Sequence, residues 1–471
     1  MDRLENFYGW ARSLQAHDIP KDVLMKSRLQ FLNMLAAAME GLRSEYMGGE
    51  PADPLFGLAT AGMIHDFDDF LFYGHTGHSS VMVPLVLGAA ADLPLGDALA
   101  AQTAANEIAG RFGGCLLMGP HNGQMWSSIH IPSTLAAAGR VLDLDPGFLA
   151  RVTAAALSHA PFVIPASFLS SEAKFFTASI PVRMSLELLR NMKSGPYRSK
   201  PAPLFDSTGG FFSAFSYIPF KRFFSDPGET WLSSGLLYKK FPGCAYLQAG
   251  VDGALKIDVY PEEIEKITVR VDPLAMAMEA WSRRCSNPQT PFTVQAGFSI
   301  RKSIGAALVS GEFTCDTLSE TWLRENGQAL DRMAGRISVV PDLRKLAGMA
   351  GRAFDSILLP AAGLKPVDGA PPPFDELKTT IEIRMQSGRG LRVEGKFPAH
   401  DAGRLKSAGA MVTAKYVSAH EKYDPGTDPG AVIEAVLEKP DAGVREIIKK
   451  SLGKKWLDKI LSMGYDVMKK G

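Results

Sequence analysis

The chain has 471 residues, a length that corresponds to two or three domains of ordinary size. Its 51 Lys+Arg and 50 Asp+Glu residues give a formal net charge of +1, so we expect neither nucleic acid nor an anionic membrane surface as a partner. Apolar residues make up 46% and charged residues 21%, values that exclude a disordered chain. The longest clean apolar run, residues 81–91, is shorter than the roughly 20 residues of a bilayer span.

The N-terminus and the cysteines indicate the compartment. The first ten residues, MDRLENFYGW, have neither a basic region nor an apolar stretch, so no secretory signal is expected. The four cysteines form no CxxC pair, which argues against zinc ribbons and iron–sulfur clusters. Scattered thiols fit a reducing environment, and the sequence therefore predicts a cytoplasmic protein.

The N-terminal half has helical periodicity. Pro20 precedes a series of apolar residues at helical spacing: Met25, Leu29, Leu32, Ala36 and Met39. Gly41 is the expected end of this helix, and Asp97 is the expected N-cap of an Ala-rich helix over Ala98–Arg111. Further helices are expected over residues 131–142 and 145–159. This pattern favours a compact all-α domain over a βαβ series.

The pattern changes after about residue 195. Residues 195–226 are rich in Pro, Gly, Ser and aromatics, which indicates irregular but substantially buried structure. Strands are expected over residues 267–271 and 337–340, and a hairpin is expected from residues 379–385 and 391–397. A helix over 298–309 lies between them, the Pro-rich residues 363–374 predict an exposed loop, and helices return from about residue 400. The fold class is therefore mainly α with an α+β insert.

Five of the nine histidines lie between residues 65 and 130. Residues 65–69 (HDFDD) are followed by a Gly- and Ser-rich loop, residues 74–80, that carries two of these histidines. Carboxylic acids and imidazoles together are typical of proton transfer, of metal binding or merely of helix caps. No HExxH spacing supports a metal site, and none is predicted. No GxGxxG, Walker or GxSxG motif appears, so a nucleotide cofactor and an elbow-type serine hydrolase are unsupported.

Several segments, in their order and spacing along nearly the whole chain, resemble the MmgE/PrpD family. This family includes 2-methylcitrate dehydratase, cis-aconitate decarboxylase and iminodisuccinate epimerase. The matching segments are Asp66–Asp69 with Gly77–Ser80, the Glu107/Gly110/Arg111 helix, VLDLD at 141–145, Lys174 in AKFFTAS, Lys239-Lys240-Phe241-Pro242, and Ala296–Gly311.

The resemblance implies a large all-α domain from both chain ends, here residues 1–235 and 405–471, and a smaller α+β lid domain, residues 236–404, in a homodimer. It also implies a cofactor-independent lyase or isomerase that acts on a small carboxylic acid by abstracting a proton next to a carboxylate. Dehydration (a hydro-lyase) is the favoured reaction, with epimerisation or decarboxylation as alternatives. No cofactor is expected.

Motif positions imply roles for individual residues. Asp66 is the first candidate acid/base and His78 the second, with His75 as its alternative because the loop is longer here than in the decarboxylases. Lys174 and Lys239 are expected to bind substrate carboxylates and stabilise developing negative charge. Lys240 is not chosen, because the family lysine lies three residues before the proline.

The chain also departs from the family pattern. Phe70 replaces a threonine, Thr177 stands where the lysine segment carries a histidine, and the usual H-x-T-x-x-x-G gives way to a stretch containing Gln124 and His130. We expect Phe70, Gln124 and His130 to contact a substrate with fewer carboxylates or a more apolar body. Two other readings stay open: a non-catalytic dimeric binding protein that kept the fold, and a metal-dependent hydrolase that uses the His-Asp cluster.

Overall fold

The described part of the chain is mainly helical, with a four-stranded sheet and a two-stranded ribbon. The computed structural model describes residues 3–49, 51–71, 74–119, 127–159, 161, 163–197, 208–224, 227–287, 289–290, 292–345, 377–397 and 405–465. The expected loop over residues 363–374 and the site residue Gln124 lie outside these ranges. The expected mainly α class with some β structure is confirmed.

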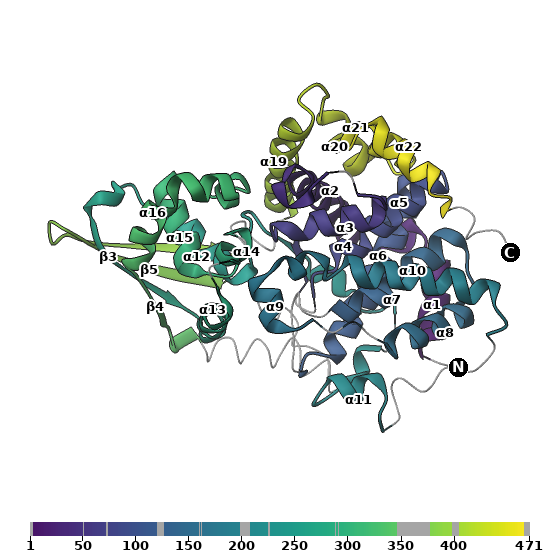
Figure 1. Cartoon of the computed structure of the whole chain (residues 1–471). Helices are drawn as coiled ribbons and strands as arrows, with labels where there is room; N and C mark the ends of the chain where they lie inside the picture. The colour runs from purple at the N-terminus through teal and green to yellow at the C-terminus, as the bar shows by residue number, and fades with distance from the viewer. Residues whose placement is uncertain are drawn as a thin grey trace.

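Helices from the first half of the chain pack around one another on the right of Figure 1. They are α1 (Arg3–Ser13), α2 (Lys21–Arg43), α3 (Pro54–Ile64), α4 (Gly77–Ser80), α5 (Met82–Ala90), α6 (Leu95–Cys115), α7 (His130–Leu142), α8 (Pro146–Leu157), α9 (Pro165–Ser170), α10 (Ser179–Ser194) and α11 (Phe211–Phe215). Many alanines of α6 and α7 are fully buried, because their small side chains allow the two helices to approach closely. The expected burial of the aromatic residues after 195 is confirmed for Phe211, Phe212, Phe223 and Phe224 and is wrong for Tyr197 and Tyr217, which are exposed.

A four-stranded sheet with its own helices lies on the left of Figure 1. Its elements are β3 (Ile264–Val271), β4 (Ile337–Pro341), β5 (Leu377–Met385), β6 (Gly390–Phe397), α12 (Gln248–Ala254), α13 (Pro273–Cys285), α14 (Phe292–Gly297), α15 (Ile300–Ser310) and α16 (Glu320–Gly335). The strand order is β4-β3-β5-β6, with β3 and β4 parallel and the other pairs antiparallel. The expected strands, hairpin and helix are all present, and Gly311 ends α15 with a φ of 75°.

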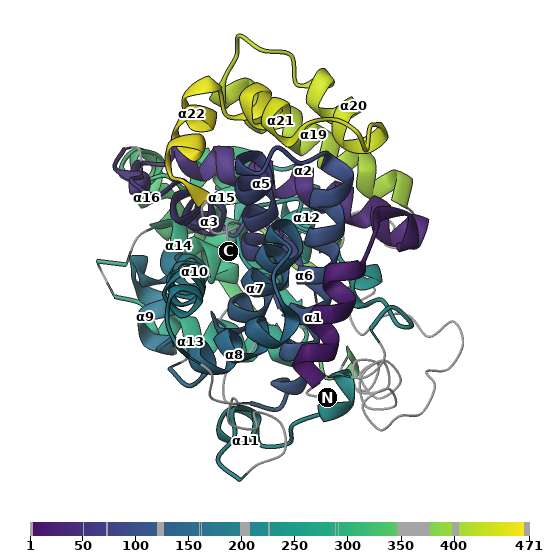
Figure 2. The same cartoon turned by 90° about the vertical axis from the view of Figure 1, so that its right-hand side faces the viewer.

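The C-terminal helices return to the N-terminal ones. They are α19 (Leu405–Tyr423), α20 (Gly430–Glu438), α21 (Val444–Ser451) and α22 (Lys454–Ser462). Helix α19 packs along α2, and α21 packs against α5 (Figure 2). The largest buried apolar cluster accordingly draws on residues 4–238 and 408–465, and a second cluster draws on residues 241–385.

Two expected helix ends were wrong, and both for reasons of tertiary contact. Gly41 lies inside α2, and a Cβ at this position would meet the backbone oxygen of Ala61 in α3 at 1.9 Å, so the glycine allows two helices to touch. Asp97 lies in the first turn of α6 and is not its N-cap. The first amides of α6 donate instead to the carbonyl oxygens of Pro440 and Ala442, at 2.7 and 2.8 Å, so no side-chain cap is needed.

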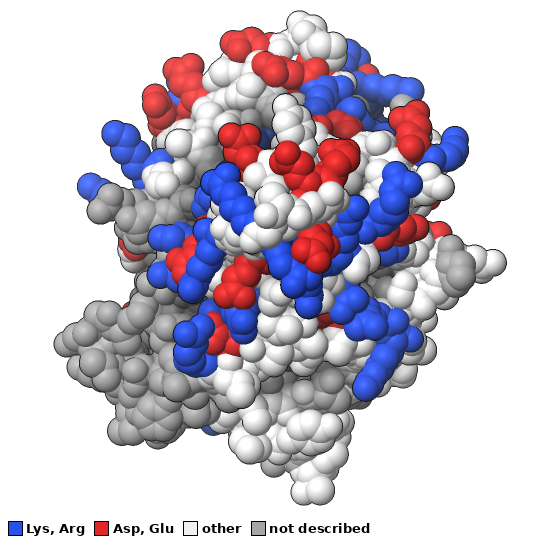
Figure 3. Space-filling view, turned by 90° about the vertical axis from the view of Figure 1, so that its left-hand side faces the viewer, with Lys and Arg blue, Asp and Glu red and all other residues white. Residues whose placement is uncertain are grey.

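The surface of the sheet side carries mixed charge. On the face in Figure 3, Lys and Arg side chains lie among Asp and Glu side chains and form no patch of one sign. Ion pairs across neighbouring strands, Arg384–Glu265 at 2.6 Å and Arg270–Glu382 at 3.1 Å, reflect this mixing. Within the part of the chain that the structure describes, no helix has the length and apolar character that crossing a bilayer requires.

Candidate functional site

The loop between α3 and α4 brings its acidic residues against a short two-stranded ribbon. In this ribbon β1 (Asp69–Phe70) pairs antiparallel with β2 (Leu237–Tyr238), Asp69 opposite Tyr238 and Phe70 opposite Leu237. This register places Lys239, the residue after β2, next to Asp68, the residue before β1, and the Lys239 amide donates to the Asp68 carbonyl at 3.3 Å. Two segments more than 160 residues apart in sequence therefore meet at the expected site residues.

Asp66 is contacted by both predicted lysines. The ammonium group of Lys174, from the 3-10 helix η5 (Glu172–Phe176), lies 2.7 Å from Asp66 Oδ1 and donates to the Met63 carbonyl at 2.8 Å. The Lys239 ammonium donates to the Asp66 carbonyl at 3.0 Å. Asp66 has a φ of 52°, a left-handed backbone conformation that is uncommon outside glycine and is over-represented at functional sites. All three side chains are buried.

Asp68, which the sequence analysis assigned no role, connects Lys239 to both candidate histidines. Its Oδ1 lies 2.5 Å from Lys239 Nζ, and its Oδ2 lies 2.9 Å from His75 Nδ1 and 3.0 Å from His78 Nε2. Burial alone would raise the pKa of Asp68, but Lys239 and the two imidazoles together hold that pKa well below its ordinary value. Burial would also lower the pKa of Lys239, but Asp68 and Asp66 raise it overall.

The charge of Asp68 fixes how the two histidines are protonated. An ionised carboxylate can only accept hydrogen bonds, so His75 Nδ1 and His78 Nε2 must each carry a proton. In a neutral imidazole the second nitrogen then has a free lone pair. That nitrogen in His78, Nδ1, is buried and has no hydrogen-bond partner among the described residues. Asp68 thus fixes the orientation of two imidazoles, the arrangement that a carboxylate and a histidine have in a catalytic triad.

Asp69, although adjacent, belongs to a different environment. Its carboxylate accepts from Gln30 of α2 at 2.9 Å, and Gln30 in turn accepts from Asn106 of α6 at 2.7 Å. Thr76 donates to Asn106 at 2.6 Å. Burial and then the neighbouring Asp68 charge raise the pKa of Asp69. This polar network joins the loop to the helical core, and we assign Asp69 a structural role.

Two further predicted residues lie beside the histidines. His130 Nδ1 is 2.8 Å from Ser79 Oγ, and its ring centroid lies 6.2 Å from that of His78. Burial, followed by the nearby His78 and His75, lowers the pKa of His130 well below its ordinary value. The Phe70 ring meets the His75 ring edge-to-face at 5.4 Å and also contacts Phe397 of β6 at 6.4 Å. The predicted residues Asp66, His75, His78, Lys174, Lys239, Phe70 and His130 are thus brought together, and Gln124 is not described.

Sequence reasoning missed a third buried lysine at this site. Lys415 of α19 donates to Asn33 Oδ1 at 2.8 Å and also to the Phe67 carbonyl. Its signal was present in the sequence, because Lys415 falls at helical spacing among buried apolar residues. Those residues are Ala408, Val412 and Ala419.

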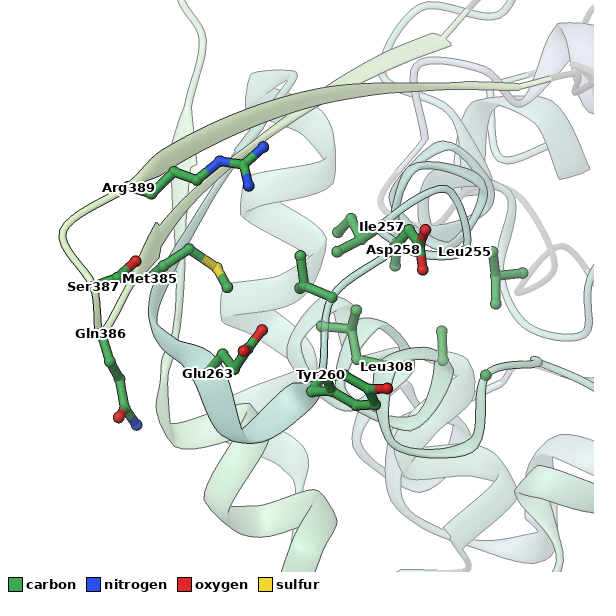
Figure 4. Close-up of a pocket in the computed structure, with 14 residues that line it drawn as sticks. Leu255, Ile257, Asp258, Tyr260, Glu263, Leu308, Met385, Gln386, Ser387 and Arg389 are labelled. Carbon is green, nitrogen blue, oxygen red and sulfur yellow. The ribbon is translucent and has the colours of Figure 1, made fainter.

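Among the described residues, no group of three or more His, Cys, Asp or Glu side chains is arranged to hold a metal ion. A cavity of about 740 Å³ lies beside the sheet, between the 254–263 segment, the end of α15 and the β5–β6 turn (Figure 4). Its charged lining residues, Asp258, Glu263 and Arg389, are all exposed. A cluster of buried ionisable groups lies instead around Asp66 and Asp68.

Neither a protein-family model nor a curated protein matches this sequence. The arrangement of Asp66, Asp68, the two histidines and the lysines therefore has to support a functional assignment by itself.

Proposed function

We propose that the chain is a cofactor-independent lyase or isomerase of the MmgE/PrpD type that abstracts a proton next to a carboxylate of a small acid. Dehydration is the preferred reaction, and epimerisation or decarboxylation are the alternatives within the same chemistry. The observation that carries the proposal is the convergence of Lys174 and Lys239 on Asp66, beside two imidazoles bound to Asp68. Buried acids, bases and cations in one cluster are rare unless function requires them.

Each group has a place in the reaction. Lys174 and Lys239 would bind the substrate carboxylate and stabilise the charge that develops when the adjacent C–H bond breaks. Asp66 would take the proton, and the electron pair of that bond would form a C=C bond as the neighbouring C–O bond breaks. His78 or His75 would act in the imidazolium form, with one ring N–H donated to Asp68 and the other directed at the substrate. That second proton would pass to the departing hydroxide, which leaves as water. Epimerisation would need only the first transfer and return of a proton to the opposite face.

Substrate entry requires part of the surroundings to move. The side chains of Asp66, Asp68, His78, Lys174 and Lys239 are at most 2% exposed. Segments that follow Lys239 cover Asp66: the Gly243 amide donates to the His65 carbonyl at 2.8 Å, and the Cys244 amide donates to the Gly297 carbonyl at 2.9 Å. We propose a division into a helical domain, residues 1–235 and 405–471, and a lid, residues 236–404, that opens over the site. The two largest apolar clusters support it except at Leu236 and Tyr238, which pack with the helical residues, and a smaller cluster with Phe168 and Phe298 joins the two parts.

The residues around the histidines bear on the substrate and the compartment. Phe70 gives the wall beside His75 an apolar surface where the family has a hydroxyl, which favours a substrate with an apolar portion. The four cysteines are all free, in keeping with a cytoplasmic protein.

The test is proton exchange in D2O with EDTA, followed by proton NMR. The panel contains 2-hydroxy, unsaturated and amino diacids and the corresponding mono-acids. Loss of an α-proton signal with new vinyl signals indicates dehydration, exchange without a new product indicates epimerisation, and release of CO2 indicates decarboxylation. If no acid exchanges and none shifts the unfolding temperature, the proposal is wrong.

A non-catalytic binding protein is the second candidate, because the ionic groups already satisfy one another inside the chain. Lys174 is paired with Asp66, and Lys239 with Asp68, at 2.7 and 2.5 Å. A binding protein would show a thermal shift with one of these acids but no exchange of its α-proton. Exchange of the α-proton catalysed by the wild-type protein would exclude this candidate.

A further inference from the structure

Helix α19 delivers one lysine into the buried loop that carries the acidic residues. Helix α19 packs along α2, and Lys415 lies on its buried face with 7% exposure. Lys406, on the same helix, is exposed to solvent. Burying the Lys415 ammonium group costs free energy, because the group loses its hydration. Hydrogen bonds inside the protein must offset that loss.

Three acceptors surround the Lys415 ammonium group. They are Asn33 Oδ1 at 2.8 Å, the Phe67 carbonyl, and the Lys239 carbonyl at 3.4 Å. The group also lies 3.5 Å from the centre of the Phe67 ring, a cation–π contact. An ammonium ion has three N–H donors and no acceptor, so it matches three acceptors, whereas a neutral amine has only two donors. The geometry therefore fits the protonated form.

We propose that Lys415 is a positioning residue that holds the Phe67 peptide between Asp66 and Asp68 and the backbone of Lys239 in the arrangement that proton abstraction requires. The proposal rests on the proposed function for its catalytic consequence, but its structural part stands on these contacts alone. Phe67 joins the two carboxylate residues, so a contact that holds its peptide group restrains the backbone that carries both side chains. Lys415 thus ties the C-terminal helices to both sides of the site.

The charge of Lys415 makes this positioning sensitive to pH. Burial lowers the pKa of Lys415 to about 7. The ionisable groups that act on it are Asp68, Cys315 and Asp69, which favour the ammonium form, and Lys239, which disfavours it. Above about pH 7 the folded protein releases this proton, and the hydrogen bond of the third donor is lost.

Stability and positioning should then change in opposite directions. The unfolded chain keeps its proton up to the ordinary lysine pKa of about 10.5, so between pH 7 and 10.5 the unfolded state binds more protons and the contribution of Lys415 to stability rises with pH. The α-proton exchange rate should fall over the same interval, because the positioned form is lost. A purely structural lysine would not produce this divergence.

The first experiment measures amide hydrogen exchange at pH 6.5 in full-length wild type, Lys415→Met and the control Lys406→Met. The amides of Asp66 and Lys239 are the reporters, because they donate to the carbonyls of Met63 and Asp68. We expect both to exchange at least about tenfold faster in Lys415→Met and at the wild-type rate in Lys406→Met. Wild-type exchange at both amides in a folded Lys415→Met protein would overturn the proposal, whatever the catalytic assay shows.

The second experiment follows the unfolding temperature and α-proton exchange from pH 6 to 10, with the panel of acids described above. Wild type should gain stability above pH 7 while exchange falls, and Lys415→Arg should retain exchange to higher pH because a guanidinium stays charged. Asn33→Asp keeps the size of the side chain and adds a negative charge beside the Lys415 ammonium group. The rise of stability with pH should therefore begin at a higher pH in this variant. The variant also tests the proposal if Lys415→Met does not fold. No shift in Asn33→Asp would overturn the proposal, whereas a shift without any substrate exchange would leave the positioning intact and reject the proposed function.

Discussion

Two lysines that are adjacent in the sequence, Lys239 and Lys240, lie in opposite environments. Lys239 is fully buried against Asp68, whereas Lys240 is exposed and lies 5.0 Å from the centre of the Phe241 ring. A one-residue change of register between β1 and β2 would exchange their environments. The pairing of this short ribbon therefore decides which lysine the site receives.

This pair gives a matched test. Lys239→Met leaves the buried Asp68 carboxylate without its cation, so we expect a loss of about 3 to 5 kcal/mol in the free energy of unfolding. Turnover should fall by about 100-fold or more, because a donor to the developing charge is gone. Lys240→Met should change stability by less than about 0.5 kcal/mol. Urea unfolding and the exchange assay measure both, and equal effects of the two substitutions would contradict the assignment.

The space beside Asp66 depends on a glycine. An added Cβ at Gly297 would lie 4.0 Å from Asp66 Oδ2 and 3.8 Å from Gly243 Cα, both ordinary contacts, so Gly297→Ala should fold normally. Its methyl group would occupy space that the substrate needs, and we expect KM to rise about tenfold. Gly335→Ala, at the end of α16, meets no atom within 4 Å and is the control. An unchanged KM in Gly297→Ala would show that the substrate does not lie there.

At the level of single residues, the sequence predicts site residues that stand in recognisable motifs. It does not predict those whose role depends on contacts with distant segments. Asp66, Lys174 and Lys239 stand in recognisable segments, and they do converge. The central position of Asp68 was not predictable, because two adjacent aspartates give no indication of which one faces a cation; the β1–β2 register decides it. Lys415 had a sequence signal, its place on an apolar helical stripe, but its three partners lie 176 to 382 residues away.

Helices and strands were likewise predictable where local sequence determines them and not where distant contacts do. The strands β3, β5 and β6 were predictable because alternation and turn residues are local signals. The end of α2 and the start of α6 were not, because they depend on Ala61 of α3 and on the carbonyls of residues 440 and 442. Glycine is ambiguous in a sequence, since it marks either the end of a helix or a close helix contact.

The contact between α2 and α3 is testable at Gly41. Gly41→Ala forces a methyl group into the Ala61 backbone, so the helices must separate, and we expect a loss of about 1 to 3 kcal/mol in the free energy of unfolding. Helix α3 leads directly into the Asp66 loop, so turnover should fall as well. Gly9→Ala in α1, with no atom within 4 Å of the added Cβ, should instead gain up to about 1 kcal/mol. Similar unfolding midpoints for the two variants would refute the packing argument.

At the scale of the whole molecule, the site lies where distant parts of the chain meet. The acidic loop follows α3, Lys174 belongs to η5, Lys239 follows β2, and Lys415 comes from the C-terminal α19. The helix-then-sheet-then-helix order was predictable from composition. The convergence of Asp66, Lys174 and Lys239 was expected from the family resemblance, and that of Lys415 was not. Composition and periodicity carry no information about which distant segments touch.

The buried imidazoles make the whole fold sensitive to acid. Burial, followed by the charge of Lys174, lowers the pKa of His65 to about 4, so this residue is neutral in the folded protein. Below the unfolded pKa of about 6.5 the unfolded state binds more protons, and stability falls as the pH drops from 6.5 toward 4, by about 3 kcal/mol for this residue. Urea unfolding across this range measures the slope, and His65→Gln should flatten it. A slope unchanged by the substitution would contradict the assignment to His65.

The most direct test of the account is α-proton exchange of the active panel acid in D2O with EDTA, compared between wild type and Asp66→Asn. Asparagine keeps an acceptor for Lys174 but cannot take the proton, so the account predicts a folded variant whose exchange rate is lower by about 100-fold or more. A folded Asp66→Asn protein that exchanges the α-proton at the wild-type rate would contradict it.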